Sequence, residues 1–346
     1  MSGDNEPREY VAGALRALAE DGELRATLVG DRALIEAALA AAPAAVRARA
    51  AVAAASQIVT MEEKPREAIR HKKDSSMRIA IDLVREGAAA ACVSAGNTGA
   101  LTAIAHFVLK TLPGVERAAI ISAIPAAHGH THMLDLGANT KATPEQLRQF
   151  AAMGAIIARD VYGVAAPRIG LLNIGEEDMK GHEVVQSAHA LLGASGLNYV
   201  GFVEGDDIFS GDVDVVVTDG FTGNVALKTA EGTARFVRQV MRDAFTSSWQ
   251  AKLGAVIAGP ALKRIRERLD PSSVNGGPLL GLNGLVIKSH GGADAKGFAN
   301  AIKVAYDLAA SGYAAQIDRN MKHLAAALPG SGPSEGPASE PVETTQ

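Results

Sequence analysis

The chain has 346 residues, of which 47% are hydrophobic and 21% are charged, and its formal net charge is −4. A chain of this length and composition can bury a substantial core in one large or two moderate domains, while the small negative charge disfavours wholesale nucleic-acid binding. The single cysteine, Cys92, excludes an internal disulfide and a cysteine-based zinc site and indicates a cytoplasmic setting. The first seven residues are polar and acidic, which is not the pattern of a signal peptide.

The first 86 residues are predicted to alternate helices and short strands. Helices are expected over residues 6–20, 32–42 and 66–86, and strands at residues 27–31 and 57–59. An α/β chain more often opens with a strand, so this start predicts that an opening strand is missing.

A polar run, HKKDSSM, interrupts the third of these helices at residues 71–77. Its cations and hydroxyls, Lys72, Lys73, Ser75 and Ser76, are compatible with an anion site. They are equally compatible with a solvated charge run, and the sequence leaves both interpretations open.

Four apolar runs each end in a Gly-containing turn with a polar side chain. These runs cover residues 91–99, 133–139, 169–175 and 213–224. A helical pattern follows the last turn directly, and helix N-termini at the carboxyl edge of an open α/β sheet favour anions. One such turn is also compatible with an ordinary strand-to-helix connection. The recurrence predicts a single crevice that receives an anion, whereas Cys92, in the first run, is interpreted as an inert core thiol.

The middle of the chain is predicted to contain a strand hairpin, residues 117–125 and 133–136, and then a helix from Pro144 to about residue 162. His128, His130 and His132 alternate near the hairpin turn, but without a nearby cysteine or clear carboxylate partner they favour a polar hairpin tip over a metal site. Further strand, turn and helix patterns continue to about residue 204. Together they predict an α/β fold with an open, mostly parallel sheet and helices on both faces.

Beyond Lys228, apolar residues recur at helical spacing and lead into an uncharged interval at residues 253–262 and then a basic cluster. The interval is too short to span a bilayer, but an apolar helix tip flanked by cations can lie in its interface. A core hairpin or a dimer contact is the alternative. The candidate membrane or carrier-protein contacts are Trp249, Val256, Ile257, Lys263, Arg264, Arg266 and Arg268.

The last part of the chain begins with a Gly-, Pro- and Asn-rich stretch at residues 271–284. A strand is predicted at residues 285–288, ending in Ser289-His290-Gly291-Gly292, and a helix over residues 295–327. We therefore expect one catalytic unit over residues 1–328, with a division into two lobes left open and a helical hairpin at about 230–270. The Pro-, Gly-, Ser- and Glu-rich tail, 329–346, is predicted to be disordered.

Six ordered motif blocks give this chain a family resemblance. They are KKDSSM at 72–77, SAGNTGAL at 94–101, LDLGAN at 134–139, GLLNIGEED with a following KG at 170–181, DGFTGNVALK at 219–228, and GGPLLGLNG with IKSHG at 276–291. In these blocks the chain closely resembles the acyl-ACP:phosphate acyltransferases, the PlsX family, through about residue 308. Family members usually place a hydrophobic strand before a Met-Gly-Gly-Asp-like turn, whereas this chain begins at Met1-Ser2-Gly3-Asp4.

The resemblance implies a fold similar to phosphotransacetylases and isopropylmalate dehydrogenase, with a protruding helical hairpin. It also implies a homodimer, peripherally attached to the inner face of the cell membrane. The implied reaction converts acyl-ACP (acyl carrier protein) and inorganic phosphate into acyl phosphate and free ACP for bacterial phospholipid synthesis. A glycerol-3-phosphate acyltransferase is the implied downstream partner.

Such a reaction requires no cofactor, metal or covalent nucleophile, because phosphate is itself an oxyanion nucleophile and a thiol leaves readily. The protein must position the reactants and stabilise a tetrahedral oxyanion. We expect Lys180 to bind phosphate or that oxyanion, Asn224 to be a neutral donor, and His290 to donate to the leaving sulfur. Candidate substrate-binding residues are Asn97, Thr98, Asn139, Gly223 and Lys228, although Asn beside Gly also stabilises turns locally.

Three alternatives differ from this interpretation. A phosphotransacetylase-like enzyme would use acyl-CoA, and a non-catalytic lipid-interface scaffold would bind vesicles without thioester loss. A β-decarboxylating dehydrogenase is disfavoured, since no acidic metal cluster or dinucleotide fingerprint is evident. The basic cluster suits acidic ACP and anionic lipid equally, and the sequence does not decide between them.

Overall fold

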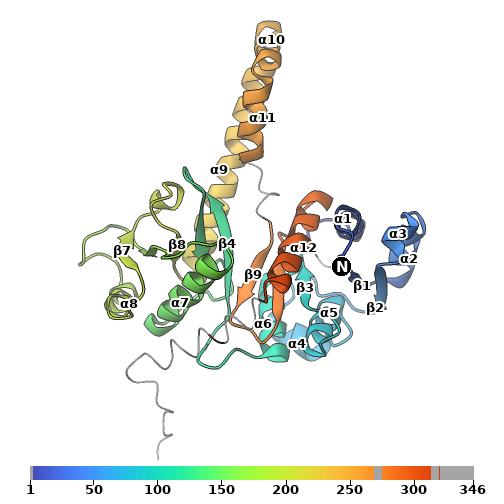
Figure 1. Ribbon diagram of the computed structural model, residues 1–346, viewed down its shortest axis with the longest axis horizontal. Coiled ribbons are helices and arrows are strands. Elements are labelled where there is room, and N and C mark those ends of the chain that lie inside the picture. Colours follow the sequence, from blue (N-terminus) through green and yellow to red (C-terminus); the bar gives the residue numbers. More distant parts are fainter. Residues whose placement is uncertain (1–2, 269–274, 313–318, 320–346) are drawn as a thin grey trace, which may run out of the picture.

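The computed structural model describes residues 3–268, 275–312 and 319 (Figure 1). Its main sheet has eight strands, whose order in space is β3-β10-β9-β4-β5-β8-β6-β7. In chain order the strands are β3 (Ala91–Ser94), β4 (Ala119–Pro125), β5 (His130–Leu134), β6 (Ile169–Leu172), β7 (Tyr199–Val203), β8 (Val215–Val217), β9 (Gly277–Leu280) and β10 (Leu285–Lys288). The predicted α/β class and predominantly parallel pairing are confirmed.

Two strands in the middle of this sheet reverse its direction. β4 pairs antiparallel with β5 and with β9, and β9 pairs antiparallel with β10. The pairs β5–β8, β8–β6, β6–β7 and β10–β3 are parallel. The sheet therefore contains two parallel groups, β5-β8-β6-β7 and β10-β3, that run in opposite directions, a division that the predicted mostly parallel sheet did not include.

Helices cover both faces of the sheet, and the alternation of apolar side chains along the strands fills a core on each side. Val215 and Val217 pack with Phe150 and Met153 of α7 (Pro144–Asp160), on the side that also includes α8 (Glu183–Gly193) and α12 (Ala295–Ala310). Val216, between the two valines, faces the opposite core with α5 (Ser76–Arg85) and α6 (Thr98–Leu109). This period-two pattern is what a strand buried on both faces requires.

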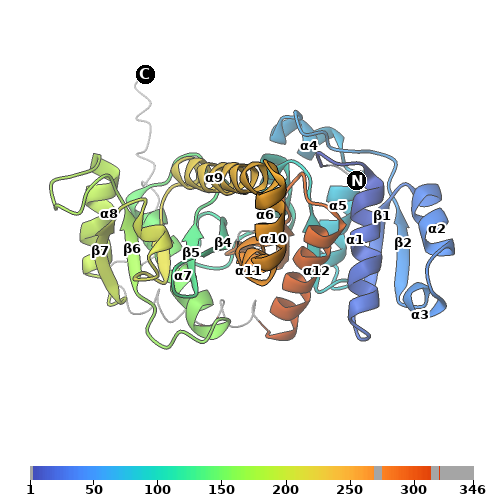
Figure 2. The ribbon, with the colours of Figure 1, turned by 90° about the horizontal axis from the view of Figure 1, so that it is seen from above.

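A second, two-stranded sheet lies beside the β3 end of the main sheet. Its strands β1 (Ala26–Gly30) and β2 (Ala50–Ala54) pair in parallel, and the nearby helices are α1 (Pro7–Glu20), α2 (Arg32–Ala40) and α3 (Ala44–Arg47). Helix α1 lies alongside α12, as Figure 2 shows from above. A cavity of about 620 Å³, lined chiefly by apolar residues, lies between β1 and β3.

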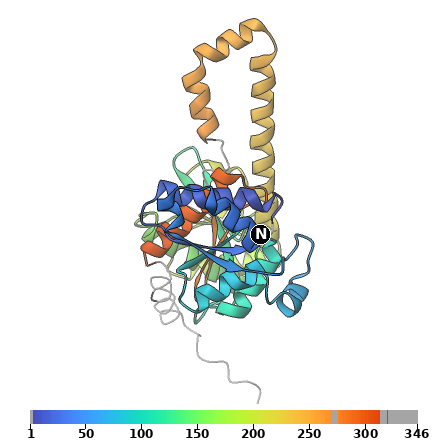
Figure 3. The ribbon, with the colours of Figure 1, turned by 90° about the vertical axis from the view of Figure 1, so that its right-hand side faces the viewer.

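A long helical projection leaves the body of the molecule. Helix α9 (Gly220–Thr246) rises from the sheet and is followed by α10 (Trp249–Ile257) and α11 (Gly259–Arg268), which turn back toward the body (Figure 3). The predicted hairpin is thereby confirmed, and α10 has no buried residue. Among residues 3–268, 275–312 and 319, none of the helices combines the length and the apolar character needed to cross a bilayer.

Three regions of the chain differ from the predicted secondary structure. The strand predicted at residues 57–59 is instead an isolated bridge from Gln57 to Ser75, and the strand of this region is the Ala-rich β2. The Gly- and Pro-rich stretch before residue 284 contains β9, which was not predicted. Helices α4 (Pro65–His71) and α5 replace the single interrupted helix that was expected over residues 66–86. A short 3-10 helix, η1 (Asp207–Phe209), lies between β7 and β8. The tail 329–346 lies outside the described residues.

Candidate active site

Three of the four Gly-containing turns leave the same edge of the main sheet. β5, β8 and β6 are parallel neighbours, so the turns after them, at residues 135–139, 218–224 and 173–181, follow adjacent carboxyl ends. The fourth turn follows β3, which runs in the opposite direction together with β10. The candidate residues after β3 and β10 therefore belong to the other strand group.

Asp135 organises the turn after β5. Its Oδ1 accepts hydrogen bonds from the backbone N–H groups of Ile120 (3.0 Å), Gly137 (3.2 Å) and Ala138 (3.0 Å). Its Oδ2 accepts from the backbone N (2.7 Å) and the side-chain Nδ2 (2.9 Å) of Asn139. Burial raises the pKa of Asp135, and the N–H donors oppose that effect. Because both oxygens only accept, the carboxylate is the form that fits this turn.

The first turn of α9 packs directly on this Asp135 turn. A Cβ added at Gly223 would lie 2.0 Å from the carbonyl oxygen of Asp135, and one at Gly220 would lie 2.5 Å from that of Asn139. The side chain of Asp219 caps the helix by accepting from Thr222 N at 2.9 Å. Gly223 thus has a packing role, and it places the exposed Asn224 against Gly137.

Lys180 lies on the turn after β6, next to the turn that carries Asn224. Its side chain is 46% exposed, and its Nζ is 3.9 Å from Glu177 Oε2. Asn173 holds the turn closed by donating to the carbonyl oxygens of Gly175 (3.1 Å) and Lys180 (3.2 Å). The predicted Lys180 and Asn224 therefore share one sheet edge, on adjacent strands, and both are accessible there.

Lys228 and His290 meet although 62 residues separate them. Lys228 Nζ lies 3.0 Å from His290 Nε2 and 2.9 Å from Glu231 Oε2, and His290 Nε2 lies 3.6 Å from the same carboxylate oxygen. Burial alone would raise the pKa of Glu231, but hydrogen bonds from His290 and Lys228 lower it to about 2. The negative charge of Glu231 thus holds the two basic side chains together.

The His290 ring has a donor beside each of its nitrogens. Its Nδ1 accepts from the backbone N–H of Gly292 at 3.0 Å, and its Nε2 lies 3.0 Å from Lys228 Nζ and 3.6 Å from Glu231 Oε2. An ammonium group only donates, so Nε2 cannot carry the ring proton and accept from Lys228 at the same time. The sequence did not predict Glu231, although its spacing of three residues after Lys228 on one helix was a usable signal.

The candidates from the other turns have structural partners. Asn97 caps α6 by accepting from Ala100 N (3.0 Å), and its Nδ2 donates to the carbonyl oxygens of Met61 (2.7 Å) and Glu63 (3.0 Å). Asn139 Nδ2 also donates to Ala118 O at 2.7 Å. These amides are engaged within the protein, and the substrate-binding roles of Asn97, Asn139 and Thr98, the first residue of α6, stay predictions.

The HKKDSSM run also has local partners. The buried Ser75 caps α5 by accepting from Arg78 N at 3.3 Å, and Lys72 Nζ lies 3.8 Å from Glu63 Oε1. Of its two open interpretations, this placement favours the structural one over an anion site.

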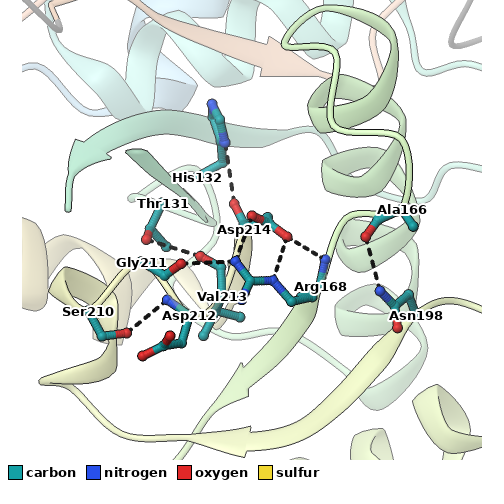
Figure 4. Close-up of polar contacts among 10 residues, drawn as sticks. All are labelled: Thr131, His132, Ala166, Arg168, Asn198, Ser210, Gly211, Asp212, Val213 and Asp214. Carbon is teal, nitrogen blue, oxygen red and sulfur yellow. Dashed lines mark hydrogen bonds and ion pairs between the residues drawn. The ribbon is translucent and has the colours of Figure 1, made fainter. Parts of the chain in front are cut away.

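The opposite edge of the sheet holds a polar network around Arg168 and Asp214 (Figure 4). Arg168, which precedes β6, donates three hydrogen bonds to the Asp214 carboxylate, from its backbone N at 2.8 Å, Nε at 3.0 Å and Nη2 at 3.1 Å. His132 Nδ1 lies 3.3 Å from Asp214 O. His132 is buried and stacked on Tyr162 with ring centroids 4.1 Å apart, and burial lowers its pKa to about 4. Within the described part of the chain, His, Cys, Asp and Glu form no group of three suited to a metal ion.

The hairpin candidates lie far along the projection. Trp249, Val256 and Ile257 are 71%, 77% and 76% exposed, which is unusual for apolar side chains on one short helix. Lys263 and Arg264 are exposed on α11. The backbones of Arg266 and Arg268 belong to the same helix, but their side chains lie outside the described part of the structure.

Solved structures share this fold. A phosphotransacetylase from Streptococcus pyogenes is 17% identical and matches with a TM-score of 0.58 over 87% of this chain and 91% of that one. A branched-chain phosphotransacylase from Enterococcus faecalis V583 is 13% identical and matches with a TM-score of 0.54 over 89% and 96% of the two chains. These likenesses confirm the predicted fold class.

Sequence relatives are much more similar. The family model described as "Fatty acid synthesis protein" matches residues 1–316. A protein from Caulobacter vibrioides, named phosphate acyltransferase, is 52% identical over 344 residues, covering 98% of this chain and 95% of its own length. One of the same name from Methylococcus capsulatus is 53% identical over 305 residues, or 88% and 90%. The chain belongs to the phosphate acyltransferase family and is an acyltransferase, as its motifs predicted.

Proposed function

We propose that the protein transfers an acyl group from acyl-ACP to inorganic phosphate, producing acyl phosphate and free ACP. The observation that supports this most directly is the accessible sheet edge at which Lys180 and Asn224 flank the N-terminus of α9. A helix N-terminus with a neighbouring cation favours an anionic reactant. Cys92 is no candidate for a covalent nucleophile, because it is 3% exposed and burial raises its pKa to about 12.

The reaction follows from placing phosphate against the thioester carbonyl. A phosphate oxygen attacks the carbonyl carbon, a C–O bond forms, and the carbonyl electrons move onto oxygen, where Lys180 and Asn224 stabilise the charge. When the C–O double bond reforms, the C–S bond breaks and ACP leaves as a thiolate. The thiolate takes its proton from water, and His290 acts as a hydrogen-bond donor to the departing sulfur.

ACP is the proposed acyl carrier because the hairpin presents exposed cations, Lys263 and Arg264, which suit an acidic protein surface. The test measures thiol release from a long-chain acyl-ACP with and without inorganic phosphate, with the matching acyl-CoA in parallel. Phosphate-dependent release that is faster from acyl-ACP, with acyl phosphate accumulating, supports the proposal. Faster release from acyl-CoA favours a phosphotransacetylase-like function, and no release from the folded protein favours a scaffold.

Lys180→Ala tests the site itself. The variant should remain folded, since Lys180 is exposed and its one carboxylate neighbour is 3.9 Å away. Its turnover should fall by at least about a hundredfold, the effect of removing one oxyanion donor. Near-normal turnover contradicts the proposed role of Lys180.

We also propose that the hairpin places the enzyme peripherally on the inner face of the cell membrane. The exposed Trp249, Val256 and Ile257, with the cations of α11 beside them, suit an anionic bilayer interface. An acyl phosphate is a reactive mixed anhydride, so a membrane glycerol-3-phosphate acyltransferase is a fitting consumer. Val256→Asp/Ile257→Asp should abolish flotation with anionic vesicles. If it leaves flotation intact but converts a homodimer to a monomer, the apolar tip is a dimer contact.

A further inference from the structure

Lys288 is a cation that folding removes from much of its contact with water, which costs free energy. It ends β10 opposite Ser94 of the parallel strand β3, and its side chain is half-buried. Its Nζ donates to the carbonyl oxygens of Ala95, at 3.4 Å, and of Ser289. Among the described residues, no carboxylate oxygen lies within 4.0 Å of it. Carbonyl groups satisfy two of its hydrogens but do not neutralise its charge.

The charged groups around Lys288 come from three segments. Burial, and then repulsion from Lys228 on α9, lower the pKa of Lys288 to about 8, while Asp4 acts in the opposite direction. Asp4 is held over the loop after β10, where its backbone N donates to Gly291 O at 2.9 Å. The carboxylate of Glu231 is already engaged with Lys228 and His290. The two carboxylates thus lie with Lys228 and over the loop after β10, and among the described residues none is in direct contact with Lys288.

This cluster is connected to the candidate catalytic residues through α9. Asn224, Lys228 and Glu231 occupy positions i, i+4 and i+7 of that helix and therefore share one face. An anion at Lys228 lies about one helical turn, or roughly 6 Å, along the axis from Asn224. That separation suits a nucleophile whose attack creates an oxyanion near Asn224.

We propose that Lys288 and Lys228 together bind the inorganic phosphate that attacks the thioester. This inference rests on the proposed function and adds a specific phosphate site to it. Phosphate supplies several acceptor oxygens and the negative charge that Lys288 does not receive from a contacting carboxylate. Glu231 acts as a positioning residue, because its carboxylate holds the Lys228 ammonium group beside His290, two residues after Lys288.

The test compares Lys288→Met and Lys288→Arg with Lys303→Met, which removes a 69% exposed lysine on α12. Equilibrium binding of inorganic phosphate is measured by calorimetry, and the KM for phosphate is measured at saturating acyl-ACP. Lys288→Met should weaken both by about tenfold to a hundredfold, the loss of one charge-assisted hydrogen bond. Lys303→Met should leave both unchanged.

The pH profile separates phosphate binding from a purely structural role. In the wild type, phosphate affinity should fall as the pH rises through about 8, because Lys288 loses its proton. Lys288→Arg should retain affinity to higher pH, since a guanidinium stays charged. If Lys288→Met does not fold, this Arg comparison alone decides the proposal.

Failure of this inference differs from failure of the proposed reaction. Phosphate-dependent thiol release with unchanged phosphate binding in Lys288→Met overturns the phosphate site and leaves the reaction intact. Phosphate binding that depends on Lys288, without thiol release in the wild type, supports the site and rejects the reaction. If Lys288→Met raises the KM for acyl-ACP instead, the anion at this position is the phosphate of the carrier's prosthetic group, and the proposal is wrong.

Discussion

Gly223→Ala should destabilise the protein even though Ala is the better helix former. Gly223 lies in the first turn of α9, and the added Cβ would be 2.0 Å from the carbonyl oxygen of Asp135 and 3.0 Å from Thr218 Cγ2. The nearer atom belongs to the backbone of a turn that Asp135 fixes with its own hydrogen bonds. The clash therefore cannot be relieved by a side-chain rotation. The helix must shift, or the turn must open.

The magnitude follows from two opposing effects. Replacing glycine by alanine inside a helix stabilises by about 1 kcal/mol, while overpacking a tight site costs about 1–3 kcal/mol or more. For a backbone contact this short we expect the upper end, a net loss of about 2 kcal/mol. Gly232, about two and a half turns further along the same helix, is the matched control. Its nearest neighbour to an added Cβ is Arg235 Nη2 at 4.0 Å, so Gly232→Ala should stabilise by roughly 0.5–1 kcal/mol.

Urea unfolding followed by circular dichroism measures both free energies, and thiol release measures activity. We expect opposite signs of stability change for two identical substitutions in one helix. Because the shift also displaces Asn224, the folded fraction of Gly223→Ala should have reduced turnover, whereas Gly232→Ala should keep it. Equal stabilisation by both substitutions would refute the proposed packing of α9 on the Asp135 turn.

Three further substitutions have expected outcomes. Folding lowers the pKa of Lys288 from 10.5 to about 8, which corresponds to a destabilisation of about 3 kcal/mol at pH 7. After the loss of two carbonyl hydrogen bonds, Lys288→Met should therefore be about 1 kcal/mol more stable than the wild type at pH 7. In denaturant titrations, the stability of the wild type should rise relative to that of the variant between pH 8 and 10.5. The pKa of His132 is about 4 in the folded protein against an ordinary value of 6.5, so the unfolded chain binds the proton first as the pH falls. The stability of the wild type should therefore fall by up to about 3 kcal/mol between pH 6.5 and 4. His132→Gln should remove this pH dependence, whereas His130→Gln, at an exposed position, should keep it. Asp135→Asn replaces one acceptor oxygen by an NH₂ donor that faces backbone N–H groups, and it should lower the free energy of unfolding in urea by about 3 kcal/mol. An unchanged free energy of unfolding would mean that Asp135 is protonated in the native protein.

Local patterns predicted the elements whose signals are local. The β-branched run before Asp219 predicted β8, and the Gly-containing turn after it predicted the start of α9, where the structure has a capped helix N-terminus. The apolar residues between Trp249 and Ile257 predicted the hairpin, because an exposed apolar helix still has helical periodicity. By contrast, β2 is a run of alanines and valine, and β9 lies in a Gly- and Pro-rich stretch, so neither has the composition typical of a strand.

The direction of the strands was not predictable in the same way. Whether β3 is parallel to β5 depends on the two antiparallel strands, β4 and β9, inserted between their groups, and pairing partners leave no local trace in sequence. The contact between Lys228 and His290 has the same origin. Each was a candidate by its own motif, but their 3.0 Å approach and the role of Glu231 depend on how α9 crosses between the strand groups.

Helix α9 is the element that turns two opposed strand groups into one site. Its first turn is fixed on the β5 side by the close approach of Gly220 and Gly223 to the Asp135 turn. Its third turn is tied to the β10 side through Lys228, Glu231 and His290. Two such attachments determine both the position and the rotation of a rigid helix. The helix is about 40 Å long, and its remaining turns extend into the hairpin. The orientation of α9 that places Asn224 and Lys228 at the site therefore also determines the direction of the exposed apolar tip.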